Sequence, residues 1–153
     1  MTDARAAGAV RIRRAEERDA AALAVLATQL GYPTTPEEAL QRLRMLSAPE
    51  LHAVFVAETA GGAVAGWVHV SANHLIESEA RAEVNGLIVD ERHRSAGAGK
   101  LLLDEAERWA REHGCSAVNL RSNVIRERAH QFYLRNGYEH YKTQKAFRKK
   151  LRP

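Results

Sequence analysis

The stretch Glu83-Val-Asn-Gly-Leu-Ile-Val-Asp-Glu-Arg-His-Arg-Ser-Ala-Gly-Ala-Gly-Lys100 decides which fold this sequence predicts. An apolar run ending at Val89 has the composition of a strand, a basic loop with glycines follows, and leucines then recur at helical spacing. This order leaves backbone N–H groups unpaired at the start of the helix, where they can bind a phosphate anion. Glycine suits the loop because a side chain would keep the backbone from closing on the phosphates. The stretch therefore predicts an anion site formed by Arg94, Ser95, Ala96, Gly97, Ala98, Gly99 and Lys100.

The segments on either side alternate between strand and helix patterns. Strand patterns occur at 10–13, 53–57, 64–70, 82–89, 117–120 and 138–151. Helix patterns run between Asp19 and Gly31, between Thr35 and Pro49, from residue 100 to Gly114, and from Arg126 to Asn136. Gly61-Gly62 predicts a hairpin turn between two of the strands, and the run 138–151 alternates well enough for a second hairpin. Strands mixed with helices predict an α/β or α+β fold, with helices on the faces of a mixed sheet.

The bulk composition limits the classes of protein that this chain can be. Its 153 residues suffice for one core, and we expect a mobile tail at residues 1–9 and a single domain at residues 10–153. The single Cys115 excludes an internal disulfide, and the lack of a signal-peptide core or membrane-length apolar run predicts a cytoplasmic protein without membrane contact. The net charge of +4 suits an anionic cofactor, but no RNA-binding or zinc-finger pattern points to nucleic acid. The seven histidines show no metal-ligand spacing, so no metal is expected.

A second motif lies about 35 residues beyond the loop, and the two motifs together indicate a family. It reads Ala129-His-Gln-Phe-Tyr-Leu-Arg-Asn-Gly-Tyr138, and together with Arg94-x-x-Gly-x-Gly99 it resembles the GCN5-related N-acetyltransferase (GNAT) family. The opening Ile12-Arg-Arg-Ala-Glu-Glu-Arg-Asp19 resembles the family's first strand and the entry to its first helix. The likeness implies a GNAT-type twisted mixed β-sheet of six to seven strands with about four helices on its faces. It also implies that the sheet is splayed between strands 4 and 5.

The resemblance implies acetyl-CoA as the acyl donor in this splayed slot. Its pantetheine arm would pair with the backbones of Leu87, Ile88 and Val89, and residues 94–100 would wrap the pyrophosphate. Ser122 and Asn123 would line the far wall.

Two residues depart from the family's pattern. Arg126 stands where many members have an asparagine that contacts the cofactor arm, and it could reach phosphate or be solvated. Ala98 stands where a bulkier residue is common, which we expect to weaken packing slightly without abolishing phosphate binding. Taken alone, the loop hexapeptide is also compatible with a helix start that binds nothing.

The expected chemistry requires a base, because an amine with a reference pKa of about 10.4 is mostly protonated at neutral pH and cannot attack a thioester. Glu83, eleven positions before Arg94, lies where several members of the family carry their catalytic glutamate, and it would take the proton directly or through a water. The backbone N–H near Leu87 could polarise the thioester carbonyl, and Tyr133 could protonate the departing thiolate. Glu83 could instead be a solvent-facing strand carboxylate and Tyr133 a core aromatic. An acyl-cysteine at Cys115 is disfavoured, because a thiol at a strand start is usually inert.

The function that the resemblance implies is N-acetyl transfer from acetyl-CoA to a primary amine by direct attack. Glu77, Glu79 and Glu83 bring negative charge near the segment expected to form the acceptor pocket, which favours a small cationic or amino-acid-like acceptor. Two alternatives stay open. One is a protein acetyltransferase acting on N-termini or lysines, which needs an open groove, and the other is a CoA-binding regulatory module without catalysis. A homodimer through the hairpin at 138–151 is a further expectation drawn from the family.

Overall fold

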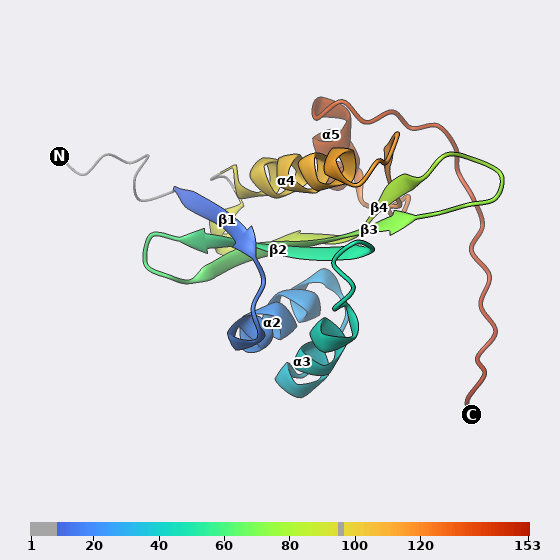
Figure 1. Ribbon diagram of the computed structural model, residues 1–153. Helices are drawn as coiled ribbons and strands as arrows, with labels where there is room; N and C mark the ends of the chain where they lie inside the picture. The colour runs from blue at the N-terminus through green and yellow to red at the C-terminus, as the bar shows by residue number, and fades with distance from the viewer. Residues whose placement is uncertain (1–8, 95–96) are drawn as a thin grey trace. The chain divides into compact units, whose positions relative to one another are not determined.

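The computed structural model describes residues 9–94 and 97–153 (Figure 1). The predicted tail, apart from Ala9, and the predicted cofactor residues Ser95 and Ala96 lie outside the described residues. The chain divides into two compact units, Met1–Arg121 and Ser122–Pro153, and each is described by itself. A single domain over residues 10–153 stays a prediction.

The first unit is built on a five-stranded mixed sheet whose strands lie side by side in chain order. The strands are β1 (Val10–Arg14), β2 (His52–Thr59), β3 (Val64–Asn73), β4 (Arg81–Val89) and β5 (Val118–Leu120). Neighbours pair antiparallel from β1 to β4, and β4 pairs parallel with β5. The predicted hairpin between β2 and β3 is confirmed, and Gly62 at its tip has a φ of +87°, which favours glycine.

The mixed α/β fold is confirmed, but the count of six to seven strands is wrong. The run 138–151 contains no strand, and all side chains from Glu139 to Pro153 are exposed. Its bulky apolar residues Tyr141, Phe147 and Leu151 are six and four positions apart, so they do not form the continuous apolar face that a hairpin needs in water. Alternation over short windows was therefore a misleading signal in this segment.

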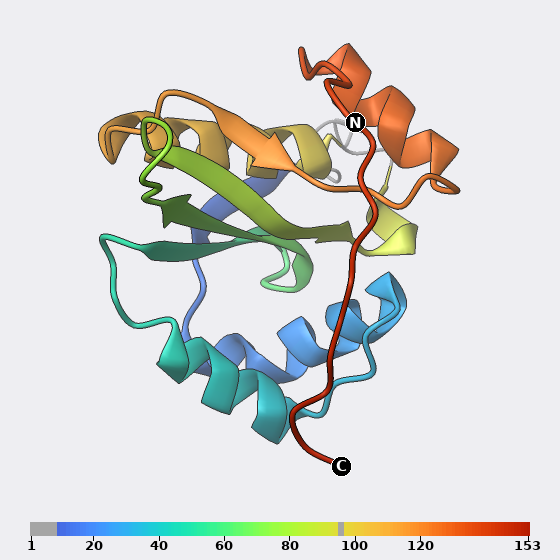
Figure 2. The ribbon, with the colours of Figure 1, turned by 90° about the vertical axis from the view of Figure 1, so that its right-hand side faces the viewer.

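Three helices of the first unit cover the two faces of its sheet (Figures 1 and 2). α2 (Ala20–Leu30) and α3 (Pro36–Met45) lie on one face and α4 (Ala98–Glu112) on the other. The predicted capping box is present at the start of α3, where the Glu38 N–H donates to Thr35 Oγ1 at 3.1 Å and the Thr35 N–H donates to Glu38 Oε1 at 3.0 Å. With α5 (Glu127–Arg135) of the second unit, the described chain has the four α-helices expected, besides the short 3-10 turns η1 (Glu17–Asp19) and η2 (Glu91–His93).

The sheet alternates side chains between these two helix layers, which fixes where the core lies. Val56, Val68 and Val70 are fully buried. On α4 the buried residues follow helical spacing: Ala98, Leu102, Leu103, Ala106, Trp109 and Ala110. Position 66 on β3, which packs against both β4 and α4, needs glycine. A Cβ on Gly66 would lie 2.6 Å from the carbonyl oxygen of Ile88 on β4 and 3.2 Å from Leu102 Cδ1 on α4.

A buried ion-pair network joins β1 to the start of α2. The Arg13 guanidinium donates to both carboxylate oxygens of Asp19, at 2.8 and 2.9 Å, and through Nε to Glu58 on β2 at 2.5 Å. The Asp19 side chain is 5% exposed, and the Arg13 hydrogen bonds hold its pKa below the ordinary value. The paired charges thus fix where the chain turns from the sheet into its first helix.

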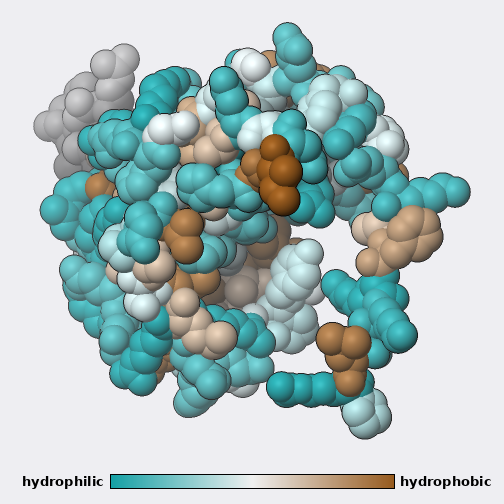
Figure 3. All heavy atoms as spheres, turned by 45° about the vertical axis from the view of Figure 1, so that its right-hand side comes forward, coloured by the Kyte–Doolittle hydropathy of each residue, from teal (hydrophilic) through white to brown (hydrophobic). Residues whose placement is uncertain are grey.

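The visible surface gives no large apolar area. Figure 3 shows a face on which hydrophilic side chains predominate and hydrophobic ones are scattered. No helix in the described part of the chain is both long and apolar enough to span a bilayer. The predicted homodimer stays a prediction.

Candidate active site

The predicted phosphate loop leads into the N-terminus of α4. Gly97 is the N-cap residue with a φ of +79°, and no side chain caps the helix. A Cβ added at Gly97 would meet no atom within 4 Å, so the space beside it is open. The first backbone hydrogen bond of the helix runs from the Leu101 N–H to the Gly97 carbonyl at 3.2 Å. The N–H groups of residues 98–100 consequently have no acceptor within the helix and are available to an anion.

The charged side chains at this helix start are cationic. Lys100 Nζ lies 2.9 Å from Asp104, one turn further along, and this partner raises the pKa of Lys100, so the ammonium is charged at neutral pH. Arg94 is exposed, and its Nε donates to the Val89 carbonyl at 3.4 Å. Both cations can therefore reach an anion at the helix start, and the first turn of α4 carries no acidic residue that would oppose it.

Asp90 shapes the turn from β4 into this loop, and the sequence analysis did not single it out. Its buried carboxylate accepts from the Arg92 backbone N–H at 3.0 Å and from the Arg92 guanidinium at 3.1 and 3.3 Å. The Arg92 side chain thereby lowers the pKa of Asp90. The available signal was an Asp directly after a strand, which commonly caps the following turn through its side chain.

The predicted splay between strands 4 and 5 is confirmed. The ladder between β4 and β5 covers only Ala82 to Val84 on β4, and β4 continues for five more residues to Val89 without β5. A β-bulge lies at the point of divergence, because His69 pairs with Gly86 and Val70 with Val84, which leaves Asn85 as an extra residue. Leu87, Ile88 and Val89 thus lie on a stretch of β4 that has β3 on one side and no β5 partner on the other.

Glu83 lies on the part of β4 that pairs with both neighbouring strands, two residues before the bulge at Asn85. It is in register with Ser71 on β3 and Asn119 on β5. Its carboxylate is only 13% exposed and accepts from Arg121 Nε at 3.1 Å, whereas the Arg121 side chain is 84% exposed. Glu83 is therefore a partly buried carboxylate on the sheet, and the interpretation as a simple solvent-facing residue is wrong.

Polar side chains gather around the bulge, and the sequence analysis missed them. The Asn85 side-chain amide donates to Ser71 Oγ at 2.9 Å and to the Glu83 carbonyl at 3.3 Å. Ser71 is a buried polar residue within a run of otherwise mostly apolar strand residues. A buried serine within a strand and an asparagine in the next one were the signals, but only the register shows that they meet.

Two histidines that looked scattered in the sequence are in direct contact. His52 Nδ1 on β2 lies 3.1 Å from His69 Nε2 on β3, with ring centroids 5.3 Å apart. Burial, followed by the proximity of His52, lowers the pKa of His69 to about 4. His52 is the register partner of Ser71, which itself pairs with Glu83, so the three residues form a row across three strands.

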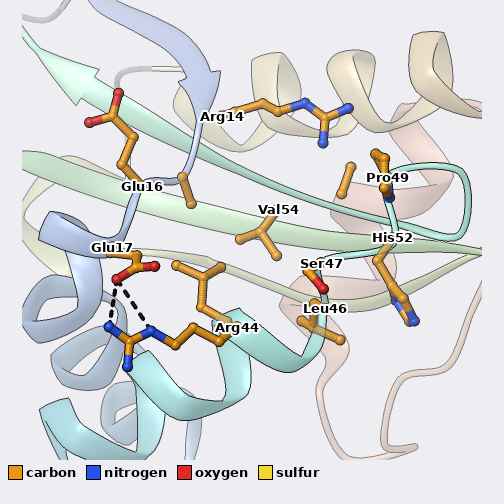
Figure 4. Close-up of a pocket in the computed structure, with 12 residues that line it drawn as sticks. Arg14, Glu16, Glu17, Arg44, Leu46, Ser47, Pro49, His52 and Val54 are labelled. Carbon is orange, nitrogen blue, oxygen red and sulfur yellow. Dashed lines mark hydrogen bonds and ion pairs between the residues drawn. The ribbon is translucent and has the colours of Figure 1, made fainter.

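A cleft of about 400 Å³ lies between α3 and the sheet at the end of this row (Figure 4). Val54 and Leu46 contribute apolar walls, and Ser47 and His52 contribute polar groups. At the opposite side of the cleft Arg44 is held by Glu17, with Nη2 and Nε at 2.8 and 3.3 Å from the same carboxylate oxygen. The cleft is of the size that small-molecule sites occupy.

The second unit contains the remaining predicted residues, Asn123, Arg126 and Tyr133. The Arg126 N–H donates to the Asn123 carbonyl at 3.0 Å at the start of α5. Tyr133 is half-buried on α5, and burial raises its pKa although Arg126 partly opposes this shift. Ser122 Oγ is buried and has no partner among the described residues. The position of these residues relative to β4 stays a prediction.

Cys115 lies at the start of the segment that leads into β5. Burial raises the pKa of the Cys115 thiol, so it stays protonated at neutral pH and is a poor nucleophile. Within residues 9–94 and 97–153, no three His, Cys, Asp or Glu side chains lie close enough to hold a metal ion.

Comparison with known proteins gives the site its context. The model of the acetyltransferase (GNAT) family matches residues 18–138. An aminoalkylphosphonate N-acetyltransferase of Salmonella typhimurium is 37% identical over 75 residues, which are 48% of this chain and 49% of that protein. The chain thus spans about half the length of this curated relative.

Solved structures share the fold over nearly the whole chain. A CoA complex of an aminoglycoside 6'-N-acetyltransferase has a TM-score of 0.81 at 19% identity and covers 92% of this chain and 94% of its own. Glucosamine-6-phosphate N-acetyltransferase from Arabidopsis thaliana has a TM-score of 0.78 at 24% identity, covering 91% and 97%. At these identities the likeness concerns the fold alone.

Proposed function

Because this chain belongs to the acetyltransferase (GNAT) family, whose model matches residues 18–138, we propose that it transfers the acetyl group of acetyl-CoA to a primary amine of a small molecule. The observation that carries the proposal is the edge of β4, which loses its β5 partner beside the glycine-capped start of α4. A strand edge and a helix N-terminus offer a row of backbone donors and acceptors followed by an anion site. That combination suits the amides and the pyrophosphate of CoA.

The residues present fit this acyl donor. Leu87, Ile88 and Val89 offer backbone groups to the pantetheine amides, in the way that a strand edge accepts another strand. Arg94 and Lys100, with the N–H groups of residues 98–100, hold the pyrophosphate. Acetyl-CoA supplies the thioester that the amine attacks.

Glu83 accepts a proton from the amine, directly or through a water. Its carboxylate is mostly buried beside the β4 bulge, and its exposed partner Arg121 can swing away when the acceptor binds. The N–H groups near the bulge polarise the thioester carbonyl. Tyr133 donates a proton to the CoA thiolate, and its raised pKa keeps the hydroxyl protonated for this role.

The acceptor is a small amine in the cleft between α3 and the sheet. A cleft of about 400 Å³ holds a small molecule, whereas a protein substrate needs an extended groove. The relative from Salmonella typhimurium is named for aminoalkylphosphonates, small molecules that combine an amine with an anionic group. Amino-acid-like amines are therefore the first acceptors to test, followed by polyamines and aminoglycosides.

The test is release of free thiol from acetyl-CoA across a panel of such amines. Wild-type protein is expected to turn over at least one of them, and Glu83→Gln to reduce kcat by about 10²-fold or more with little change in acetyl-CoA affinity. Glu112→Gln is the matched control, because Glu112 lies at the far end of α4 in an exposed pair with Arg108. Tight cofactor binding without turnover, unaffected by Glu83→Gln, would instead identify a regulatory module. Acetylation confined to peptides would identify a protein acetyltransferase.

A further inference from the structure

We propose that His52 binds the acceptor amine in the cleft and takes up the first of its two protons, and that His69 is the positioning residue that holds the His52 ring. This inference rests on the proposed function and deepens it. It arises from the contact between the two imidazoles and from the place of His52 on the cleft wall (Figure 4). Nothing in the spacing of the histidines along the chain indicates it.

The proton balance of the reaction calls for a second acceptor besides Glu83. An amine that arrives as R–NH₃⁺ leaves as an amide with one N–H, so the nitrogen loses two protons while the new C–N bond forms and the C–S bond breaks. One proton ends on the CoA sulfur, and the other goes to solvent. Glu83 and Tyr133 account for the proton that reaches the sulfur, and His52 accounts for the one that reaches water.

The sheet register places His52 correctly for this role. Paired residues on neighbouring strands point to the same face, and His52, Ser71 and Glu83 are paired in sequence across β2, β3 and β4. With strands about 4.8 Å apart, the backbone of His52 lies about 10 Å from that of Glu83, so side chains from both can reach one small amine between them. His52 lines the cleft and Glu83 does not, so an amine bound by both extends from the end of the cleft across Ser71.

His69 determines which nitrogen of His52 faces the cleft. Because burial holds its pKa near 4, His69 is neutral over the physiological range. The 3.1 Å contact allows either nitrogen to donate, and we assign the tautomers in which His52 Nδ1–H donates to the lone pair on His69 Nε2. The other His52 nitrogen, Nε2, then carries a lone pair that can accept a proton from the acceptor. Protonation leaves the hydrogen bond to His69 intact, so the ring keeps its orientation.

Charged groups lie on both sides of the histidine pair. On β4, Glu83 is paired with Arg121, whose side chain is 84% exposed and can move into solvent. On the α3 side of the cleft Arg44 is paired with Glu17 of η1 at 2.8 Å, and Glu16 is paired with Arg18, so neither pair adds a net charge to the cleft. Arg14 also lines the cleft, and its guanidinium lies 5.3 Å from the centre of the Phe55 ring.

The experiment compares pH profiles of kcat/KM for the best amine of the panel. His52→Gln is expected to lower kcat/KM by about 10²-fold at pH 7, and the loss should shrink toward pH 9, where more of the amine arrives unprotonated. His69→Gln should retain the histidine-dependent limb of the profile but move its midpoint. His74→Gln, an exposed histidine outside the cleft, should match the wild type at every pH.

Two results would overturn the inference. A loss of kcat/KM in His52→Gln that is equal at all pH values indicates a structural role. A loss of kcat/KM in Glu83→Gln without any loss in His52→Gln removes His52 from the proton path. An NMR titration of the wild-type imidazoles provides an independent test, since the His69 ring should stay neutral between pH 5 and 8. Wild-type protein that turns over no amine refutes the proposed function itself, whereas active protein with an unaffected His52→Gln variant refutes only this inference.

Discussion

Replacement of Gly66 by alanine tests whether the packing of β3 against β4 and α4 sets the position of the β4 edge that we propose binds the cofactor. The added Cβ would lie 2.6 Å from the Ile88 carbonyl oxygen and 3.2 Å from both Val89 Cα and Leu102 Cδ1. Ordinary C···O contacts of this kind are about 3.3–3.6 Å, so β4 must move by about 0.7 Å or more. Two of the three atoms belong to the backbone and cannot rotate away.

The expected cost follows from that geometry. Overpacking a well-packed core costs about 1–3 kcal/mol, and backbone neighbours place Gly66→Ala near the upper end, so we expect a loss of about 2–3 kcal/mol in the free energy of unfolding. The same displacement moves Ile88 and Val89, two of the residues proposed to hold the pantetheine arm. The Kd for acetyl-CoA should therefore rise several-fold.

Urea denaturation and calorimetric titration with acetyl-CoA measure the two effects. Gly61→Ala is the matched control, because its nearest neighbour would be Thr59 Oγ1 at 3.9 Å, and it should change the unfolding free energy by less than about 0.5 kcal/mol. If Gly66→Ala unfolds at the same urea concentration as Gly61→Ala and binds acetyl-CoA equally well, the reasoning from this contact is refuted.

Three further predictions, two of them with a matched control variant, have separable outcomes. Asp19→Asn leaves the buried guanidinium with only one carboxylate and should lower the unfolding free energy by about 2–3 kcal/mol at pH 7 in urea denaturation. The pKa of Asp19 is lower in the folded state than in the unfolded state. Its contribution to the free energy of unfolding is therefore complete above the unfolded pKa of about 3.9 and is lost as the pH falls through the folded value. The unfolding free energies of variant and wild type should converge only in acid. Gly97→Ala and Gly114→Ala place a side chain at φ values of +79° and +74° and should each cost about 1–2 kcal/mol, but calorimetry should show weaker acetyl-CoA binding only for Gly97→Ala. Tyr133→Phe should lower kcat about tenfold or more without changing the KM for acetyl-CoA, whereas Tyr141→Phe should leave both unchanged in the thiol-release assay.

Local patterns predicted the elements that carry the cofactor residues. The strand expected at 82–89 is β4 (Arg81–Val89), and the helix expected at 126–136 is α5 (Glu127–Arg135) with Arg126 and Asn136 as its caps. These signals are short-range, since apolar runs, capping residues and glycines after a helix act within a few positions. The strand and the helix on either side of the glycine loop could accordingly be predicted from local patterns, whereas the roles of Leu87, Ile88 and Val89 came from the family resemblance and stay a prediction.

Features that depend on pairing between distant segments could not be predicted. The bulge at Asn85 exists only because β3 and β4 pair out of step at that point, and the contact between His52 and His69 joins residues 17 positions apart. A shift of register by one residue would turn these side chains to the other face of the sheet. Composition and local spacing do not indicate where the register between β3 and β4 shifts.

The acceptor side of the site is the part that the structure changed most. Glutamates at 77, 79 and 83 suggested a cationic acceptor, and Arg44, Ser47 and His52 line the cleft in which we propose that the acceptor binds. With both signs of charge on its walls, the cleft suits an amine that also carries an anionic group. This feature agrees with the amino-acid-like acceptors placed first in the panel.

The central claim is transfer of an acetyl group to a small amine, and the most direct measurement detects the product. Wild-type protein is incubated with acetyl-CoA labelled with ¹³C in the acetyl group and with the amine panel, and the amines are analysed by mass spectrometry. We predict that at least one small primary amine acquires the labelled acetyl group in equal amount to the free CoA released. Protein that binds acetyl-CoA tightly but leaves every amine unlabelled would contradict the claim.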